Sequence, residues 1–598
     1  MTSFLSSLLL PAPHSPVRPA QSFVPFLKIS SVRTNGKPQT YRKTAGASAT
    51  AKILNQSPQA PESSSLPNVA GPSSGAKRRG EPTVPAAVFS VFDNIINNFI
   101  DPPVHPSVDP RYVLSGNFAP VDELPPTECE VVEGSLPPCL DGAYIRNGPN
   151  PQYFPRGPYH PFDGDGMLHS IKISQGQATL CSRYVKTYKY TTERDAGTPL
   201  HHNVLFSGYN GLTASAARVA LNTARTLAGQ FDLENGFGLA NTSLAFFGNR
   251  LYALAESDLP YSVRLTSNGD IETLGRHDFN GKLLRNMTAH PKIDPETSEA
   301  FAFRYGPIPP FLTYFYFDAN GNKQPDVPIF STSGPCFPHD FAITKNHAIF
   351  PDIQLGINPM KMIFGGGSPV GADPIKVPKV GIIPRYAKEE SKLRWFDTPG
   401  FNPIHIINAW EEEDGNTIVM IAPNMLPIEH TLERMDLVHC LVEKVTIDLK
   451  TGVVKRRPIS VKNLDLAVIN PAYTAKQNRY VYAAIGDPMP KFSGVVKLDV
   501  SKGESQECTE GVRMYAPGCY GGEPFFVARE PGNPDAEEDD GYVVSYVHDE
   551  NTRESTFLVM DAKSPELDIV AAVKLPRRVP YGIHGLFVRE TDLHKLQC

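Results

Sequence analysis

The chain has little of what a disulfide-stapled or membrane-spanning protein needs. Its 598 residues include eight cysteines with no CxxC pair and no regular spacing, so a disulfide framework is not expected and a reducing compartment is favoured. No segment approaches the roughly 20 consecutive apolar residues that a membrane-spanning helix needs. A net charge of −6 argues against a nucleic-acid-binding surface.

The first 60 residues contain no aspartate or glutamate, and the first acidic residue is Glu62. They are rich in Ser, Thr, Ala and Pro, with Arg18, Arg33 and Arg42 scattered among them, which is typical of an organelle transit peptide. The many hydroxyl side chains favour a plastid over a mitochondrion. Low complexity continues to about residue 80 and predicts a transit peptide and disordered leader over 1–80; a disordered tail without a targeting role is the alternative.

Residues 84–101 have a different character. Polar residues occupy one helical face, and a double proline after Asp101 ends the run. The apolar residues at helical spacing are Val88, Phe92, Ile95, Ile96, Phe99 and Ile100. The pattern predicts an amphipathic helix, which either packs on the main domain or lies in a lipid surface. Its polar face has no Lys or Arg, so electrostatic attraction to a lipid surface is not indicated.

The remainder, 104–598, is predicted to be rich in β-hairpins, because short apolar or alternating runs flank Asn-Gly and Asp-Gly turn pairs. Predicted strand pairs include 341–344 with 347–350 and 404–410 with 417–421. A helix near 213–227 interrupts the strands and is expected to form a cap. No linker breaks this region, so one large propeller is favoured over tandem sandwiches, although no repeated motif counts its blades.

Four of the 16 histidines, far apart in the chain, lie at predicted strand ends with small or apolar neighbours. They are His290, His339, His405 and His584. Imidazoles on four separate strands can converge on one metal where the strands radiate from a common axis, as in a β-propeller. Four neutral imidazoles suit Fe, Zn, Cu or Ni, and open positions on a redox-capable metal suggest Fe(II) with room for O2. A purely structural role for each histidine is the alternative.

Metal-ligating histidines need carboxylates at their outer nitrogens to fix the tautomer. Candidates with apolar neighbours at a strand or turn are Glu256, Glu443 and Glu523, and an ordinary surface glutamate is the alternative for each. Asp165 and His169 are further candidate ligands, and His160 has no assigned role. The acidic run 411–414 is expected at the solvated tip of a hairpin.

These motifs resemble those of the carotenoid cleavage dioxygenases, from about Phe118 to Val588. Besides the four histidine segments, the matching motifs are Arg146-Asn147-Gly148-Pro149-Asn150-Pro151, Phe162-Asp163-Gly164-Asp165-Gly166-Met167-Leu168-His169 and Tyr520-Gly521-Gly522-Glu523-Pro524. The leader, the segment 101–103 and Phe364-Gly365-Gly366-Gly367-Ser368 are most similar to the plant type-4 subgroup, which is associated with plastoglobules.

The resemblance implies an all-β fold, a seven-bladed β-propeller with a helical dome over one face, preceded by the disordered transit peptide. It implies that the four histidines bind Fe(II) and that Glu256 and Glu523 support them. For the third carboxylate the family position falls at Lys444, one residue from Glu443. The segment 163–169 becomes structural, with Phe162 lining the substrate tunnel and Thr242 approaching the iron.

The implied activity is cleavage of a carotenoid or apocarotenoid double bond by O2, giving two carbonyl products. The 9,10 and 9′,10′ bonds are expected, which would release an apocarotenal and a thirteen-carbon ketone of the β-ionone type. Alternatives are 11,12 cleavage of 9-cis-epoxycarotenoids for abscisic acid synthesis, a non-catalytic carotenoid-binding propeller, and an isomerase that consumes no O2. The expected location is the chloroplast, at the plastoglobule, with peripheral association with plastid lipid droplets or membranes.

Overall fold

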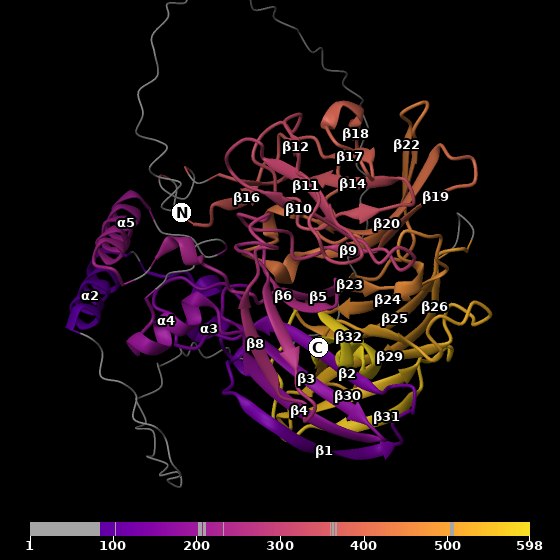
Figure 1. The fold of residues 1–598 in the computed structure, drawn as a ribbon, viewed down its shortest axis with the longest axis horizontal. Helices are drawn as coiled ribbons and strands as arrows, with labels where there is room; N and C mark the ends of the chain where they lie inside the picture. Colours follow the sequence, from indigo (N-terminus) through magenta and orange to yellow (C-terminus); the bar gives the residue numbers. More distant parts are fainter. Residues whose placement is uncertain are drawn as a thin grey trace, which may run out of the picture. The chain divides into compact units, whose positions relative to one another are not determined.

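The computed structural model divides the chain into two compact units, residues 1–79 and 80–598. The structure describes residues 84–101, 103–200, 206, 211–230, 232–358, 360, 364, 367–502 and 507–597, all in the second unit. The predicted leader over 1–80 lies outside these residues. The described part is mostly β with few helices (Figure 1), and none of its helices is long and apolar enough to cross a membrane.

Within the described residues, four antiparallel sheets have four strands each and follow one another along the chain (Figure 1). They comprise β5 (Ser243–Phe247), β6 (Arg250–Leu254), β7 (Tyr261–Leu265) and β8 (Ile271–Arg276); β9 (Lys292–Ile293), β10 (Ala300–Tyr305), β11 (Leu312–Phe317) and β12 (Val327–Ile329); β13 (Ala342–Ile343), β14 (His347–Asp352), β17 (Lys379–Pro384) and β18 (Arg394–Asp397); and β19 (Asn408–Glu411), β20 (Thr417–Leu426), β21 (His439–Asp448) and β22 (Val454–Pro458). A short pair, β15 (Leu355–Ile357) and β16 (Val370–Ala372), stands apart from them.

A larger sheet joins the end of the described chain to its beginning. Its strands are β23 (Leu464–Val468), β24 (Tyr480–Gly486), β25 (Phe492–Asp499), β26 (Thr509–Met514), β27 (Cys519–Gly521), β28 (Phe525–Ala528), β29 (Gly541–Asp549), β30 (Glu554–Asp561), β31 (Ile569–Lys574), β1 (Leu124–Gly134), β4 (Gln177–Tyr184), β3 (Gly166–Ser174), β2 (Gly142–Pro149) and β32 (Gly585–Arg589). The late strands β31 and β32 pair with the early strands β1 and β2. This pairing ties the carboxyl-terminal part of the domain to its first strands.

The hydrophobic core lies between successive sheets. One cluster packs Phe247 of β5 against Phe317 of β11, and the next packs Phe303 of β10 against Phe350 of β14. Further clusters join the β13–β18 sheet to β19–β21, those strands to β24 and β25, and so on until β2–β4 meet β5–β8. The apolar faces of consecutive groups of strands are therefore buried against each other, and the last group packs against the first.

Burial decreases from the inner strands to the outer strands of a sheet. Eight of the ten residues of β20 are buried, whereas none of the five residues of β22 is buried. This difference explains why β20 is almost continuously apolar, since a strand covered on both faces needs no polar alternation. The outer strand β22 is basic (Lys455, Arg456 and Arg457), as expected for an edge that must stay soluble.

The amphipathic segment is helical as α2 (Val84–Ile95) and continues as the wider-turned η2 (Ile96–Ile100). It packs beside α5 (Gly211–Leu227) through its polar face, because the fully buried Asp93 pairs with the fully buried Arg225. Most of its large apolar side chains, including Phe92 and Phe99, are exposed. The two alternatives for this helix are thus compatible: it packs on the domain and still presents an apolar face to solvent.

The other helices are short and lie between or beside the strands. They are η3 (Pro106–Val108), α3 (Pro110–Val113), η4 (Gly116–Phe118), α4 (Tyr188–Ala196), η5 (Leu233–Asn235), η6 (Glu390–Lys392), η7 (Ile428–His430), η8 (Met435–Leu437), η9 (Pro471–Tyr473), α7 (Glu590–Leu593) and η10 (His594–Gln597).

Both predicted strand pairs are confirmed, since β13 pairs with β14 and β19 pairs with β20. The helix predicted near 213–227 is confirmed as α5. The expectation of a solvated acidic tip over 411–414 is wrong for its first residue. The Glu411 side chain is only 11% exposed and accepts hydrogen bonds from Asn346 and Thr344, because the neighbouring β13–β14 turn covers it.

Candidate metal centre

The four histidines singled out in the sequence come together. Each lies in the short segment that leads into one strand: His290 before β9, His339 before β13, His405 before β19 and His584 before β32. One ring nitrogen from each lies within 4.8 Å of those of the other three. Each of the first three strands is an edge strand of its own sheet.

Three of the four imidazoles have a carboxylate at Nδ1. Glu256 Oε1 lies 2.7 Å from His339 Nδ1, Asp465 Oδ1 lies 2.9 Å from His405 Nδ1, and Glu523 Oε1 lies 2.8 Å from His584 Nδ1. A carboxylate in this position favours the tautomer that carries its proton on Nδ1, and it leaves the lone pair on Nε2 free for a metal.

The carboxylates are held in turn by groups from their own surroundings. The Tyr305 hydroxyl donates to the second oxygen of Glu256, and the Gly585 backbone N–H donates to the second oxygen of Glu523. The Leu466 backbone N–H donates to Asp465. With both the ring and its carboxylate fixed, little rotational freedom remains to be lost when a ligand binds.

The chemistry of the donor set fits a metal ion. His584 Nε2 is buried and has no hydrogen-bond partner, and His290 Nε2 lies only 3.0 Å from His339 Nε2. About 3.0 Å is the separation expected for two adjacent nitrogens around an ion with bonds of about 2.1 Å. A buried lone pair without a donor costs free energy, which a cation among the four nitrogens would remove.

The electrostatics of the centre keep His290 neutral. Burial, together with the other three imidazoles, holds the pKa of His290 well below its usual value. Burial also opposes the charged form of His405, but the adjacent Asp465 carboxylate outweighs it and raises the pKa of this ring. The same contact holds the pKa of Asp465 below its usual value against the effect of burial. A neutral His290 is able to coordinate a cation at physiological pH.

The sequence-based expectation for Glu443 is wrong. Its carboxylate accepts a hydrogen bond from Asn424 Nδ2 and lies 3.1 Å from Arg456 Nε, not beside a histidine. Glu443 belongs to β21, which β20 separates from the inner strand β19. Two strand spacings amount to about 10 Å, which is too far for contact with the His405 segment.

Asp465, on β23, takes the position that was expected for Glu443, and sequence reasoning missed it. A signal was present, because Asp465 lies between Leu464 and Leu466 in the short apolar run that forms β23. Glu256 and Glu523 also have apolar neighbours at a strand or turn, so Asp465 shares the pattern that indicates these two glutamates. Tyr305, which supports Glu256 from β10, gave no sequence signal, since buried tyrosines are common in such strands.

A cavity of about 190 Å³ adjoins the centre. His339 and His405 form part of its wall, and most of the remaining lining is apolar, with Phe206, Phe337, Leu355, Met425, Met489 and Phe492 among the contributors. Phe162 and Thr242, both named from the sequence, also line it. The backbone carbonyl of Thr242 accepts a hydrogen bond from the His584 N–H, which places this residue directly beside the histidines. An elongated apolar molecule in the cavity would therefore reach the metal centre.

His160 is not among the described residues that line the cavity, but it contacts two that do, Phe162 and Leu432. His160 Nδ1 accepts the Phe162 backbone N–H, and its Nε2 lies 3.1 Å from the carbonyl oxygen of Leu432. Burial lowers the pKa of His160 to about 4, so the ring is neutral and donates from Nε2. His160 thus joins two segments of the cavity wall, and it is not a member of the four-histidine cluster.

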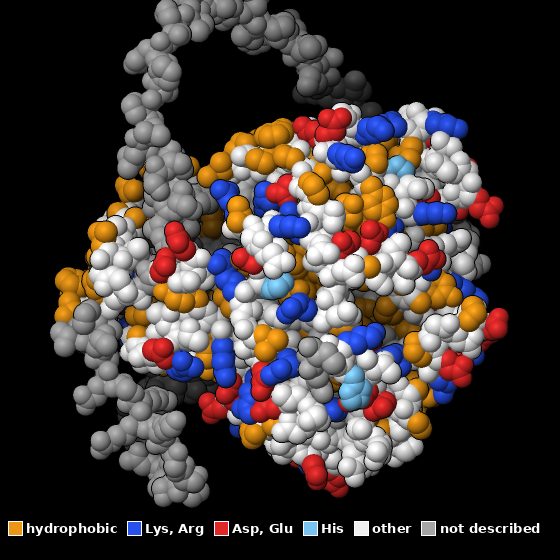
Figure 2. Space-filling model, in the orientation of Figure 1, with side chains coloured by type: hydrophobic (Ala, Val, Ile, Leu, Met, Phe, Trp, Pro, Cys, Tyr) orange, Lys and Arg blue, Asp and Glu red, His pale blue; other side chains and the backbone are white. Residues whose placement is uncertain are grey.

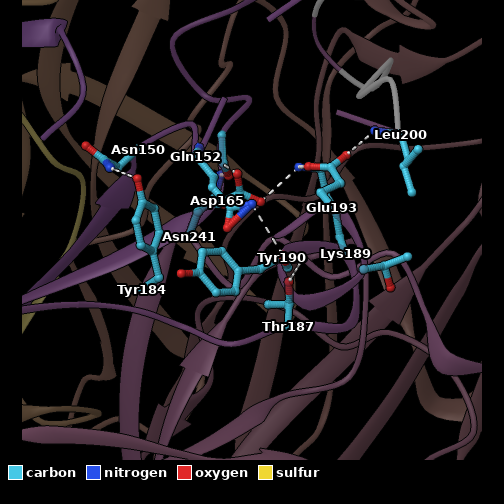
Figure 3. A network of polar contacts seen from close by, with 12 residues as sticks. Asn150, Gln152, Asp165, Tyr184, Thr187, Lys189, Tyr190, Glu193, Leu200 and Asn241 are labelled. Atoms are coloured by element: carbon cyan, nitrogen blue, oxygen red, sulfur yellow. Dashed lines mark hydrogen bonds and ion pairs between the residues drawn. The ribbon is translucent and has the colours of Figure 1, made fainter. Parts of the chain in front are cut away.

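The other candidate ligands of the sequence, Asp165 and His169, belong to separate polar contacts. Asp165 Oδ1 accepts a hydrogen bond from Lys189 Nζ at 2.8 Å, and Lys189 Nζ also donates to Glu193. Lys189 therefore links the two carboxylates in one network (Figure 3). Lys189 and Glu193 lie on α4, whose start is capped by the Thr187 side chain. His169 Nδ1 pairs with Ser182 Oγ. Neither residue joins the metal centre.

Four convergent imidazoles beside an apolar cavity define a candidate mononuclear metal enzyme that acts on an apolar substrate. Residues 118–589 match the family described as RPE65, retinal pigment epithelial membrane protein. A probable chloroplastic carotenoid cleavage dioxygenase 4 of Arabidopsis thaliana is 69% identical over 527 residues, which is 88% of each chain. The chloroplastic 9-cis-epoxycarotenoid dioxygenase NCED1 of Oryza sativa subsp. japonica is 59% identical over 86% of this chain and 81% of its own.

Among solved structures, a cobalt-substituted apocarotenoid oxygenase of Synechocystis superposes with a TM-score of 0.65. It is 26% identical, and the match covers 81% of this chain and 99% of that one. The chain belongs to the RPE65/carotenoid cleavage dioxygenase family, and it is a carotenoid cleavage dioxygenase. The alternative of a propeller that only binds carotenoid is therefore set aside.

Proposed function

We propose that the protein cleaves the 9,10 and 9′,10′ double bonds of a carotenoid or apocarotenoid with O2, using Fe(II) held by His290, His339, His405 and His584. The products would be an apocarotenal and a thirteen-carbon ketone of the β-ionone type. The observation that carries the proposal is the convergence of four imidazole nitrogens within 4.8 Å at the wall of an apolar cavity. Iron at this centre would supply the activation of O2.

The chain's own residues prepare that reaction. Glu256, Asp465 and Glu523 keep three imidazoles in the tautomer that leaves Nε2 free. The apolar cavity excludes water and holds the polyene in an extended position, so that the depth of insertion decides which bond reaches the metal. Phe162 and Thr242 would both contact the polyene, and Thr242 would do so close to His584.

We also propose that the sheets form a seven-bladed β-propeller. The four separate sheets account for four blades, and the larger sheet supplies the strands of three more: β23–β26, β27–β31, and β1–β4 with β32. The apolar clusters between neighbouring groups support this assignment, because they run from each group to the next and from the last to the first. The β2–β32 pairing would close the ring, and the helices α4 and α5 would belong to the dome.

Product analysis tests the reaction. Full-length protein loaded with one equivalent of Fe(II) is mixed in detergent under air with β-carotene or with an apocarotenal, and the products are separated by liquid chromatography with mass detection. A thirteen-carbon ketone with the matching aldehyde, absent under argon, is the expected result. Intact carotenoid from protein that retains its iron would contradict the proposal, and isomerised carotenoid without O2 uptake would replace it with an isomerase.

A second candidate is 11,12 cleavage of a 9-cis-epoxycarotenoid. The 59%-identical rice relative named as a 9-cis-epoxycarotenoid dioxygenase favours it. The same experiment with a 9-cis-epoxycarotenoid separates the two candidates, because cleavage at 11,12 releases a fifteen-carbon aldehyde in place of the thirteen-carbon ketone. The preferred reaction is the one with the higher kcat/KM under identical conditions.

We further propose that the protein is directed to the plastid by residues 1–80 and associates there with plastoglobules through α2 and η2. Relatives named as chloroplastic support the plastid location.

The lipid association is supported by five exposed apolar side chains of α2 and η2, with Phe99 exposed to 81%. They are Val88, Val91, Phe92, Ile95 and Phe99. Figure 2 shows hydrophobic side chains gathered over α2 and α5 at the left edge of the view. The buried Asp93–Arg225 pair fixes the orientation of the helix, so that its apolar side remains outward.

Flotation with vesicles of uncharged galactolipid tests this association. Phe92→Ser combined with Phe99→Ser should lower the bound fraction more than tenfold, because each phenylalanine contributes about 1.5–3 kcal/mol when buried in an apolar phase. Ile375→Ser is the matched control, since Ile375 is 91% exposed in the segment between β16 and β17 and lies outside the helix. Equal flotation of the double variant and the native chain would contradict the proposal.

A further inference from the structure

One buried carboxylate connects three of the four histidine segments. Asp340 follows His339 directly, and its side chain is 3% exposed. Its Oδ2 accepts the backbone N–H of Ile406, the residue after His405, at 2.8 Å. It also pairs with Lys292, two residues after His290, with Nζ at 2.8 Å from Oδ1 and 3.0 Å from Oδ2. The three segments are otherwise far apart in sequence and lead into three different sheets.

Two further bonds complete the arrangement. Lys292 Nζ donates to the carbonyl oxygen of Ile406 at 3.3 Å, and the Phe341 backbone N–H donates to Asp340 Oδ1 at 2.7 Å. The contacts among Lys292, Asp340 and Ile406 therefore form a closed triangle, which we call the Asp340 bridge. A change in the spacing of any two of the three segments would break at least one side of the triangle.

The bridge does not line the substrate cavity. None of Lys292, Asp340 and Ile406 is among the described residues that line it. Lys292 and Asp340 carry opposite charges and pair with each other. We therefore expect the bridge to act on the reaction mainly through the positions of His290, His339 and His405, whereas Glu256, Asp465 and Glu523 set ring tautomer and rotation.

We propose that Asp340 and Lys292 are positioning residues that hold His290, His339 and His405 at metal-binding distance. This inference rests on the metal centre of the proposed function and extends it to a layer of residues that contacts no ring. Loss of the bridge would let the three segments separate, so that a cation would have to draw them together when it binds. The ordering cost would appear as weaker metal affinity.

Cobalt titration of metal-free protein tests the bridge with a readout that does not depend on cleavage. Co²⁺ is added to the native chain and to Asp340→Asn, and binding is followed by the visible absorption of the bound ion. We expect a dissociation constant about 10–100-fold higher for the variant, and a changed absorption band once the site is saturated. Cleavage per bound metal should fall in kcat with little change in KM, because the cavity wall is intact.

Asp539→Asn is the matched control. Asp539, in the turn before β29, pairs with Lys497 of β25 at 2.6 Å, and both side chains are buried, but neither element leads from a histidine of the centre. We expect this variant to lose thermal stability and to bind Co²⁺ with the native affinity and spectrum. A stability loss common to both variants is thereby separated from an effect on the centre.

Lys292→Met and Lys292→Arg replace Asp340→Asn if that variant does not fold. Arginine preserves a cation in contact with Asp340, so its affinity should lie between those of the methionine variant and the native chain. Native cobalt affinity and an unchanged spectrum in folded Asp340→Asn or Lys292→Met would overturn the inference. Failure of the native chain to bind Co²⁺ would instead overturn the metal centre of the proposed function.

Discussion

The four-histidine centre and the Asp165–Lys189–Glu193 network are both buried and polar, but their polar atoms are satisfied in different ways. In the network, Lys189 donates to both carboxylates, and the remaining oxygens accept from the backbone N–H groups of Gln152 and Leu200 (Figure 3). Burial opposes the charge of Lys189, but the two carboxylates outweigh it and raise its pKa. The partners that Figure 3 shows for these three side chains are all protein groups.

At the centre, the outer nitrogens of three imidazoles are satisfied by carboxylates, whereas the inner nitrogens meet only one another or no partner. His584 Nε2 has no partner, and two Nε2 atoms face each other at 3.0 Å. The network is complete without a ligand, whereas we expect the centre to gain stability when a cation binds. Unsatisfied inner atoms distinguish a buried polar site that binds a ligand from one that only holds segments together.

The largest effect is expected from His405→Ala. The variant loses one of four ligands, so metal content should fall to a small fraction of one equivalent and cleavage to the level of metal-free protein. The loss of the Asp465 partner should cost only about 1–3 kcal/mol of stability. Metal analysis and far-ultraviolet circular dichroism of the purified variant check this. A variant with native activity would contradict the assignment of His405 as a ligand.

Lys189→Met should show the opposite pattern. Removal of the cation leaves Asp165 and Glu193 buried without their shared partner, so the free energy of unfolding should fall by about 3–5 kcal/mol. Metal content per folded chain should stay at the native value, because none of the three residues belongs to the centre. Denaturant unfolding and metal analysis measure the two quantities. A selective loss of metal without a loss of stability would contradict the comparison.

Asp465→Asn should weaken metal affinity about 10–100-fold, because the amide no longer fixes the proton on His405 Nδ1. The matched control is Glu443→Gln, which removes a buried charge from the Asn424 and Arg456 contacts and should lower stability alone. Cobalt titration of both variants measures the difference. Equal affinities in the two variants would mean that the carboxylate at His405 has no role in metal binding.

The local sequence pattern drew attention to the four histidines but left a structural role open, and the resemblance to the carotenoid cleavage dioxygenases supplied the assignment. Each has small or apolar neighbours and leads into a strand, and both properties can be read within a few residues. The partner of His405 could not be predicted in this way. Asp465 and Glu443 have similar local patterns, and only the strand order, in which β20 separates β21 from β19 while β23 begins the next group, decides between them.

The orientation of α2 was open for a related reason. Helical periodicity separates an apolar face from a polar one, but it does not say which face meets the protein. The buried partners of Asp93 and Asn97 are Arg225 and Arg218, more than 100 residues away on α5. Arginines in a predicted cap helix do not reveal such pairs in advance. Local propensity therefore placed the helices and hairpins, while the contacts that orient them required the folded chain.

The smallest effect is expected at a third polar site, where His347 and Glu411 repeat the histidine–carboxylate pair of the centre. His347 Nδ1 lies 3.0 Å from Glu411 Oε1, and Thr344 and Asn346 also donate to the same carboxylate. Burial alone would raise the pKa of Glu411, but these donors outweigh it and lower the pKa to about 2. His347 is not part of the metal cluster, so this pair is expected to stabilise the fold alone.

Glu411→Gln should therefore lower the free energy of unfolding at neutral pH, by up to about 3 kcal/mol for a pKa depressed from 4.5 to about 2. A depressed carboxyl pKa stabilises the folded state above the unfolded pKa, and this contribution is lost as the pH falls through the folded pKa. The stability gap between the native chain and the variant should thus be constant above about pH 5 and narrow toward about pH 3.

Denaturant unfolding across this range measures the gap, and metal content should stay native throughout the neutral range. A gap that stays constant down to about pH 3 would show that the carboxylate charge is not what stabilises this turn, and a loss of metal would show that a histidine–carboxylate pair outside the cluster also acts on the centre.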